Sequence, residues 1–301
     1  MNRIIDRFGV QEAFNSENLL ESIRLAEGRT MVSEIICPMI PLLYDISNVE
    51  LAAAFGADIL LLNLYDVNQP NIYGIECKNE ESPIQATKRL TGRFVGVNLE
   101  PVDPTLKQNS ISKGRQATLE NIEKLIEQGA DFVVLTGNPK VGVSHDSIVK
   151  SIEAIKKNFN NKILIIAGRM HASGDRNAIG RNLIDTRKLH DMIDAGTDII
   201  LLPAPATVPG LSRENISDLI HECHKKNKLV MTTIGTSQEG ADTDTIKAIA
   251  LMSKEAGSDL HHIGDCGYGP GIAVPENIMN YSIVIKGRRH TYRRMAGSIN
   301  R

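Results

Sequence analysis

Four ionisable residues lie within or soon after short apolar segments of this chain. Glu100 follows FVGVNL, Arg169 follows KILIIAG, His262 lies within LHHI, and Asp265 comes soon after it. A carboxylate or an imidazole can carry a proton in acid–base catalysis, and a nearby arginine can neutralise an anionic substrate. We therefore predict that Glu100 and His262 act as acid or base. Arg169 and Asp265 complete the predicted catalytic set.

Further polar residues follow the same kind of segment and are predicted to bind a small anionic substrate. They supply amide, hydroxyl, imidazole and ammonium groups: Asn63, Asn98, Thr136, Asn138, Lys140, His171 and Thr233. Two glycine-rich segments, GTSQEG at 235–240 and GDCGYGPG at 264–271, come later in the chain. Glycine lets backbone N–H groups approach an anion closely. The predicted phosphate-binding residues are Gly235, Thr236, Ser237, Gly264, Gly267 and Gly269.

The acidic residues also suggest a metal ion. Glu100 and Asp265 supply oxygen ligands of the kind that Mg²⁺ prefers, so we predict a Mg²⁺ site that uses both. The sequence has no HxH, HExxH or paired-cysteine spacing, so it does not predict a tightly bound transition metal. No organic cofactor is predicted. Glu100 has a second interpretation, in which it caps a helix or pairs with Arg169 or Lys140.

A repeated segment shows how the chain brings these residues together. Four times a glycine and a small residue precede an aspartate and an apolar run, starting at Gly56, Gly129, Gly196 and Gly257. The copies begin 73, 67 and 61 residues apart, which leaves room for two strand–helix pairs in each interval. Further apolar runs lie at 33–37, 94–99, 162–167 and 228–233. Eight strands alternating with helices predict an α/β fold, a (βα)8 TIM barrel of eight parallel strands, with a helix at 16–26 closing the bottom.

The barrel determines where reactive residues lie, because its active sites occupy the carboxyl ends of the strands. When the four copies are aligned on their aspartates, Asn63 and Thr136 share the fifth position after it, and His262 occupies the third. The two positions have equal parity, so they point to the same side of a strand. We expect His262 to face the barrel interior and His261 to face the helices. A buried, hydrogen-bonded neutral histidine is the alternative interpretation of His262.

Length, composition and charge agree with one such domain over residues 1–301. The chain has 301 residues, 42% of them apolar, which is enough for one large core. The formal net charge of −2 gives no reason to expect a nucleic-acid or membrane partner. From Asn277 onward the chain has six basic residues and no acidic one. We expect a solvated last helix there, with an oligomer contact or an anion-binding patch as the alternative.

The sequence predicts a cytoplasmic protein. The first 14 residues lack the apolar core of a secretion signal, and no apolar stretch is long enough to cross a bilayer. Four scattered cysteines form neither a disulfide framework nor a zinc pattern. The long loops at 64–81 and 101–116 are predicted to close over the substrate or to form contacts in a homo-oligomer.

Five segments carry a resemblance to a known family: GVNLEP, TGNP, AGRMHASG, TIGTSQEG and GDCGYGPG. Through them the chain is similar, over nearly its whole length, to a bacterial (βα)8-barrel family labelled phosphoenolpyruvate phosphonomutase-like or putative hydrolase. The resemblance implies a small phosphorylated or carboxylated substrate and Mg²⁺. The sequence lacks the cysteine-containing catalytic loop of phosphonomutases and isocitrate lyases, so the resemblance supports the fold more than the reaction.

These residues lead to three hypotheses of function. The first is an enzyme that acts on a small phosphorylated or carboxylated metabolite at the barrel mouth, by lyase- or isomerase-type proton transfer. The second is a Mg²⁺-assisted hydrolase of a small anionic substrate. The third is a non-catalytic metabolite sensor or assembly factor.

Overall fold

Eight parallel strands close into a barrel in the computed structural model, which describes residues 2–9, 15–103, 111–171, 180–235, 238–264 and 269–300. The strands are β1 (Thr30–Ile36), β2 (Ile59–Asn63), β3 (Phe94–Leu99), β4 (Phe132–Leu135), β5 (Leu164–Gly168), β6 (Ile199–Pro203), β7 (Leu229–Ile234) and β8 (Leu260–Ile263). Each strand pairs with the next in sequence, and β8 pairs with β1. The predicted TIM barrel is confirmed.

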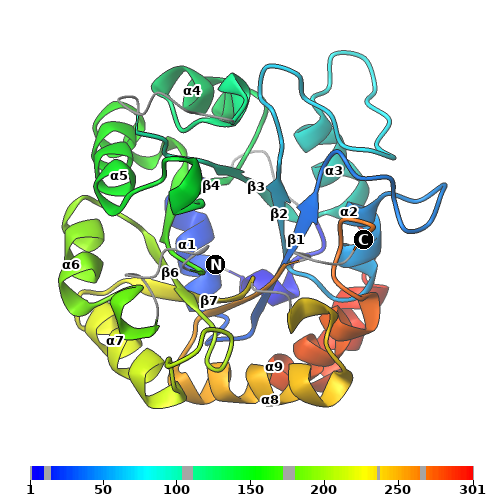
Figure 1. The fold of residues 1–301 in the computed structure, drawn as a ribbon. Coiled ribbons are helices and arrows are strands. Elements are labelled where there is room, and N and C mark those ends of the chain that lie inside the picture. Colours follow the sequence, from blue (N-terminus) through cyan, green and yellow to red (C-terminus); the bar gives the residue numbers. More distant parts are fainter. Residues whose placement is uncertain are drawn as a thin grey trace.

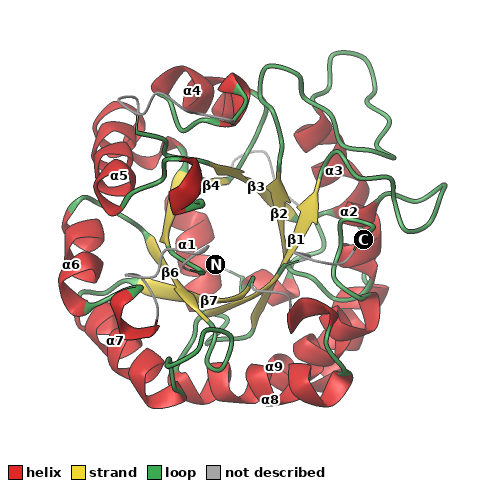
Figure 2. Ribbon diagram, viewed as in Figure 1, coloured by secondary structure: helices red, strands yellow, loops and turns green. Residues whose placement is uncertain are grey.

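Helices accompany the strands, and all but the first lie on the outer side of the barrel, as Figure 1 and Figure 2 show. They are α1 (Ser16–Arg24), α2 (Asn48–Ala54), α3 (Pro83–Thr91), α4 (Leu119–Glu127), α5 (His145–Phe159), α6 (Thr186–Asp194), α7 (Arg213–Lys225), α8 (Thr243–Ala256) and α9 (Pro275–Ala296). Several begin at a residue whose side chain accepts a backbone N–H of the first turn, such as Ser82 at α3 and Thr118 at α4. Such caps satisfy N–H groups that have no partner inside the helix. In the described ranges, no helix is both long enough and apolar enough to cross a membrane.

Side chains alternate along each strand between the barrel interior and the layer beneath the helices. On β2, Leu61 belongs to the interior cluster, whereas Leu60 and Leu62 pack with the outer one. Both surfaces are apolar, which explains why the strands are nearly continuous apolar runs. Leu19 and Ile23 of α1 pack with the interior cluster. The first helix therefore closes the bottom of the barrel, as predicted.

The aspartate of each repeated segment joins two neighbouring strands at the amino-terminal end of the barrel. Its carboxylate accepts a backbone N–H of the preceding strand at 2.8–2.9 Å, and its own N–H donates to the carbonyl of that same residue. The pairs are Asp58 with Met31, Asp131 with Val95, Asp198 with Ile165, and Asp259 with Val230. In the sequence these aspartates only marked the repeated segment. They also bridge β1 to β2, β3 to β4, β5 to β6 and β7 to β8.

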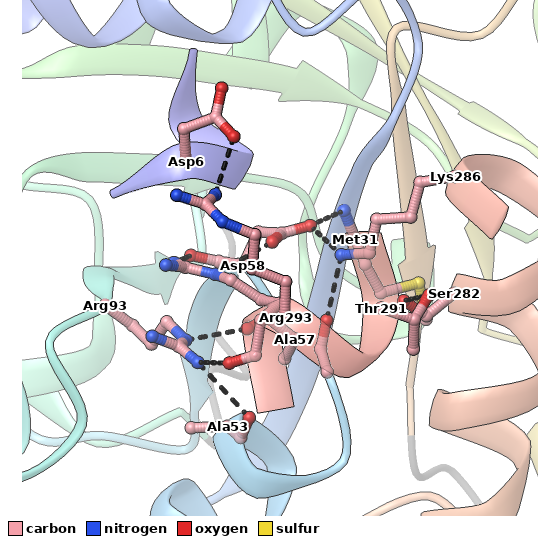
Figure 3. A network of polar contacts seen from close by, with 12 residues as sticks. Asp6, Met31, Ala53, Ala57, Asp58, Arg93, Ser282, Lys286, Thr291 and Arg293 are labelled. Atoms are coloured by element: carbon pink, nitrogen blue, oxygen red, sulfur yellow. Dashed lines mark hydrogen bonds and ion pairs between the residues drawn. The ribbon is translucent and has the colours of Figure 1, made fainter. Parts of the chain in front are cut away.

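Asp58 lies in a cluster of buried charges beside α9 (Figure 3). Lys286 Nζ lies 2.5 Å from Asp58 Oδ2, and Arg294 Nε lies 2.9 Å from Asp58 Oδ1; no side chain of the three is more than 1% exposed. Arg93 is buried beside them and donates to the carbonyl oxygens of Ala57 and Arg294. Burial lowers the pKa of Lys286 to about 8, and Asp58 opposes that shift. One carboxylate therefore supports several buried cations.

The basic carboxyl-terminal segment is partly internal, so our expectation of a solvated last helix was wrong for two of its residues. Lys286 and Arg294 are buried, because both form ion pairs with the buried carboxylate of Asp58. Arg293, which is partly exposed, donates to Asp6 at 2.7 Å. Gly287, with φ +77°, interrupts α9, a backbone conformation that glycine adopts without a steric penalty.

Replacing Asp58 with asparagine should destabilise the fold by about 3–5 kcal/mol, because the buried cations would lose their counter-charge. Urea unfolding monitored by circular dichroism measures this change. The matched control is Asp218→Asn on the exposed side of α7, which should change the free energy of unfolding by less than about 0.5 kcal/mol. Equal stability of the two variants would contradict a structural role for the cluster.

Candidate functional site

Polar side chains replace the apolar interior residues at the carboxyl-terminal mouth of the barrel. They continue the inward-facing alternation of the strands below them and are nearly all buried: Glu34, Asn63, Asn98, Glu100, Thr136, Thr233 and His262. Buried polar groups are costly unless they are hydrogen-bonded or serve a function. The mouth is therefore the candidate functional site of the barrel.

His262 and Glu34 form a buried pair inside the barrel, across the contact between β8 and β1. His262 Nε2 lies 2.9 Å from Glu34 Oε2, and the side chains are 0% and 2% exposed. The predicted inward orientation of His262 is confirmed. A carboxylate at Nε2 favours the tautomer with its proton there, which leaves a lone pair on Nδ1. His262 Nδ1 is buried and has no hydrogen-bond partner in the described part of the chain.

His261 points to the opposite side of β8, as predicted. Its Nε2 lies 3.1 Å from the carbonyl oxygen of Gly28, and its ring lies 5.7 Å from that of Tyr281. Burial lowers the pKa of His261 to about 3, so this imidazole is neutral at physiological pH. It packs β8 against the outer layer and has no place at the mouth.

Glu34 was missed by our reading of the sequence. We searched the residues that follow each strand, whereas Glu34 lies within β1. The available signal was a single acidic side chain in the apolar run TMVSEII, at the same parity as the inward-facing Val32. Room for its carboxylate depends on Gly264, because a side chain there would lie 3.1 Å from Glu34 Oε2.

His171 and Arg169 lie in the segment that follows β5, and the charges of Glu34 and Arg169 both act on the His171 imidazole. Burial lowers the pKa of His171, the negative charge of Glu34 raises it, and the positive charge of Arg169 lowers it. Arg169 Nη2 also donates to the carbonyl oxygen of Val143 at 3.3 Å. We call Glu34, Arg169, His171 and His262 the His262 group.

Asn63, Asn98, Glu100 and Arg115 make a second set of contacts, on β2, β3 and the loop after β3, which we call the Glu100 group. Asn98 Nδ2 donates to Asn63 Oδ1 at 3.3 Å. Arg115 donates to Glu100 Oε1, so the sequence-based pairing of Glu100 with Arg169 or Lys140 was wrong. Burial raises the pKa of the Glu100 carboxyl, although Arg115 opposes this shift.

Two oxygen atoms of the Glu100 group are buried and accept no hydrogen bond from the residues that the structure describes. They are Asn98 Oδ1 and Glu100 Oε2, two positions apart on the inward side of the chain. An unpaired buried acceptor is destabilising unless a ligand satisfies it. Mg²⁺ prefers oxygen ligands of this kind and usually keeps several water ligands, so Asn98 Oδ1 and Glu100 Oε2 are suitable ligands for that ion. Among the described residues, no three His, Cys, Asp or Glu side chains cluster as a metal site.

The other predicted substrate-binding residues are placed less uniformly. Thr136 is buried at the end of β4, and the Thr233 hydroxyl donates to the carbonyl oxygen of Leu202 at 3.1 Å. Asn138 Oδ1 accepts the backbone N–H of Lys140 at 2.8 Å, so this side chain stabilises its own turn. The Lys140 side chain is exposed.

The predicted phosphate-binding glycines differ in their surroundings. Gly235 packs closely on Met170, and the N–H of Gly264 already donates to the Ile234 carbonyl at 2.8 Å. Gly269 is exposed, with open space where a side chain would be. Asp265, Thr236, Ser237 and Gly267 lie outside the described residues. Phosphate binding by these loops stays a prediction.

Titration of His171 tests the His262 group without a substrate. In NMR, His171 should titrate below the range of an exposed histidine, because burial disfavours its charged form. Arg169→Gln should raise the midpoint by removing a repelling charge, and Glu34→Gln should lower it further by removing an attracting one. His224 on α7, which pairs with Asp259, is the internal control and should not respond. If the titration midpoint of His171 is unchanged in both variants, Glu34 and Arg169 do not lie close enough to His171 to influence it.

Comparison with known structures agrees with the barrel. A 2,3-dimethylmalate lyase, a member of the PEP mutase/isocitrate lyase superfamily, has a TM-score of 0.52 at 14% identity, over 85% of this chain and 82% of its own. The carboxyl transferase domain of Rhizobium etli pyruvate carboxylase has a TM-score of 0.52 at 14% identity, over 94% of this chain and 51% of its own. Likeness at this identity shows the fold alone.

No curated protein matches the sequence. A family match, in contrast, extends over residues 10–301, from before the first helix to the end of the chain. The chain therefore belongs to the family described as a domain of unknown function, DUF7916.

Proposed function

We propose that this protein is an enzyme that carries out lyase- or isomerase-type proton transfer on a small carboxylated or phosphorylated metabolite at the barrel mouth. The observation that carries this proposal is the buried pair of Glu34 and His262, 2.9 Å apart. Apolar residues occupy the position of His262 in the other copies of the repeat, as in Leu61 and Val134. Because a buried ionisable pair costs free energy that apolar packing would not, a chemical role accounts for it.

Proton transfer at this pair would use His262 Nδ1. A C–H bond next to a substrate carbonyl would break, its proton would pass to Nδ1, and its electron pair would remain on the substrate as an enolate. Glu34 would hold the imidazole through Nε2–H and stabilise the imidazolium that forms. In the reverse direction the imidazolium would return the proton. Glu34 is thus a positioning residue, and His262 is the acid or base.

The positive charge of Arg169 near His171 supports an anionic substrate. Arg169 and His171 belong to the same group, and the guanidinium of Arg169 stays charged at any physiological pH. A substrate carboxylate or a developing enolate next to this charge would be stabilised.

The Glu100 group supports a requirement for Mg²⁺. Asn98 Oδ1 and Glu100 Oε2 would hold the ion. When bound, Mg²⁺ would polarise a substrate oxygen and stabilise negative charge there. Arg115 would remain the counter-ion on the other oxygen of Glu100. Asp265 as a further ligand stays a prediction.

Activity is tested in D₂O with a panel of 2-hydroxy and 2-oxo carboxylic acids and their phosphorylated analogues. Proton NMR should detect deuterium exchange next to a carbonyl, or carbon–carbon cleavage. Glu34→Gln and His262→Asn should each lower kcat by about 10²- to 10⁴-fold, and Asp218→Asn should not. Full activity of both variants would rule out the proposed proton transfer. In a separate reaction in H₂¹⁸O, incorporation of solvent oxygen into the product would indicate the hydrolase instead.

Mg²⁺ binding is tested by calorimetry, which does not depend on turnover. Glu100→Gln should weaken Mg²⁺ binding at least about tenfold, because it removes a charged ligand. Arg115→Gln should strengthen it, since the carboxylate loses a competing cation. The two variants alter the same ion pair in opposite ways, so each serves as the control for the other. Equal affinity of Glu100→Gln and the wild type would exclude this site.

A further inference from the structure

Large apolar side chains concentrate on the loop that follows β1. The exposed ones on this loop and on the neighbouring loop after β2 are Met39, Ile40, Leu42, Leu43, Tyr44, Ile46 and Tyr73. We call these seven residues the apolar patch. Tyr44 is 94% exposed and Ile40 is 68% exposed. In Figure 1 the loop after β1, drawn in blue, projects outward beyond α2 and α3.

Hydrogen bonds hold this loop in one conformation. The Ile46 N–H donates to the Leu43 carbonyl at 3.1 Å, and the Leu42 N–H donates to the Asn48 side chain at 3.1 Å. The Tyr73 N–H donates to the Cys37 carbonyl at 3.2 Å, which joins the loops after β1 and β2. An ordered surface loses little conformational entropy on binding, so the patch is suited to a stable contact.

The charges around the patch restrict its partner. Between residues 37 and 47, Asp45 is the only charged side chain. The adjoining segment, 74–81, carries three glutamates and one lysine. An acidic border disfavours nucleic acid and anionic lipid, which attract basic surfaces. A nearly uncharged centre, in contrast, permits two identical surfaces to meet without strong repulsion.

The size of the patch agrees with a protein–protein contact. Taking roughly 150–250 Å² for each large side chain when fully exposed, the patch presents on the order of 700 Å². This area includes the whole exposed surface of the seven residues. It is close to the roughly 800 Å² that each partner contributes to a standard stable interface.

We propose that the apolar patch is the centre of an interface between two copies of this chain. In a two-fold dimer the same surface lies on both sides, so one apolar patch covers another. A second copy is also the partner that is present at the concentration of the protein itself. The interface would lie beside the barrel mouth, because the Ile36 N–H at the start of this loop donates to the carbonyl of Gly271 at 3.0 Å, in the segment after β8.

Sedimentation equilibrium of the full chain tests the interface, independently of the proposed reaction. The wild type should have twice the 33.0 kDa mass of one chain. The double variant Ile40→Asp, Tyr44→Asp should be monomeric, because it brings like charges together in an apolar contact. Its circular dichroism and melting temperature should show a folded protein, since both side chains are exposed.

A matched control changes two half-exposed apolar residues outside the patch. Leu251→Asp with Tyr292→Asp should leave the dimer intact. A monomeric wild type, or a dimer that survives the Ile40 and Tyr44 changes, would overturn the proposal. Loss of the dimer in the control variant would also overturn the proposal. Wild-type monomers that sediment with phosphatidylcholine vesicles would identify the patch as a lipid contact instead.

Discussion

Four aspartates at the amino-terminal end of the barrel hold its strands together in pairs; Asp58 is fully buried and the other three are partly buried. Each bridges two neighbouring strands through a carboxylate and a backbone N–H, and each has a basic side chain beside it. Burial raises the pKa of Asp131, and Lys88 together with the Val95 N–H opposes that shift. Asp58, which is fully buried, has two cations, Lys286 and Arg294. Buried carboxylates are stable here only because charge and hydrogen bonds compensate them.

The register between neighbouring strands determines which side chains reach the mouth. Parallel pairing places His262 opposite Val32, so that Glu34 lies one inward-facing position further along β1. Successive side chains on a strand face opposite sides, so a slip of one residue would exchange His262 for His261. The side chains presented at the mouth therefore depend on the register between β8 and β1.

The two ends of the barrel differ in the polar groups that they contain. At the amino-terminal end, ion pairs and hydrogen bonds link elements distant in sequence, and the buried atoms Arg294 Nη1 and Thr30 Oγ1 have no hydrogen-bond partner among the described residues. At the mouth, His262 Nδ1, Asn98 Oδ1 and Glu100 Oε2 are buried with no hydrogen-bond partner among the described residues. In (βα)8 barrels generally, residues at the amino-terminal end contribute to stability, and active sites lie at the carboxyl-terminal end.

The sequence by itself determined the eight strands, the closing helix and the inward direction of His262, because each follows from local spacing along the chain. Only the tertiary structure decided the partners. Glu34, the partner of His262, lies 228 residues away from it in the sequence. Glu100 pairs with Arg115 and not with Arg169 or Lys140. Lys286 is buried against Asp58. The physical reason is that periodicity gives the direction of a side chain, whereas the identity of its neighbour depends on which distant strands and loops the closed barrel brings together.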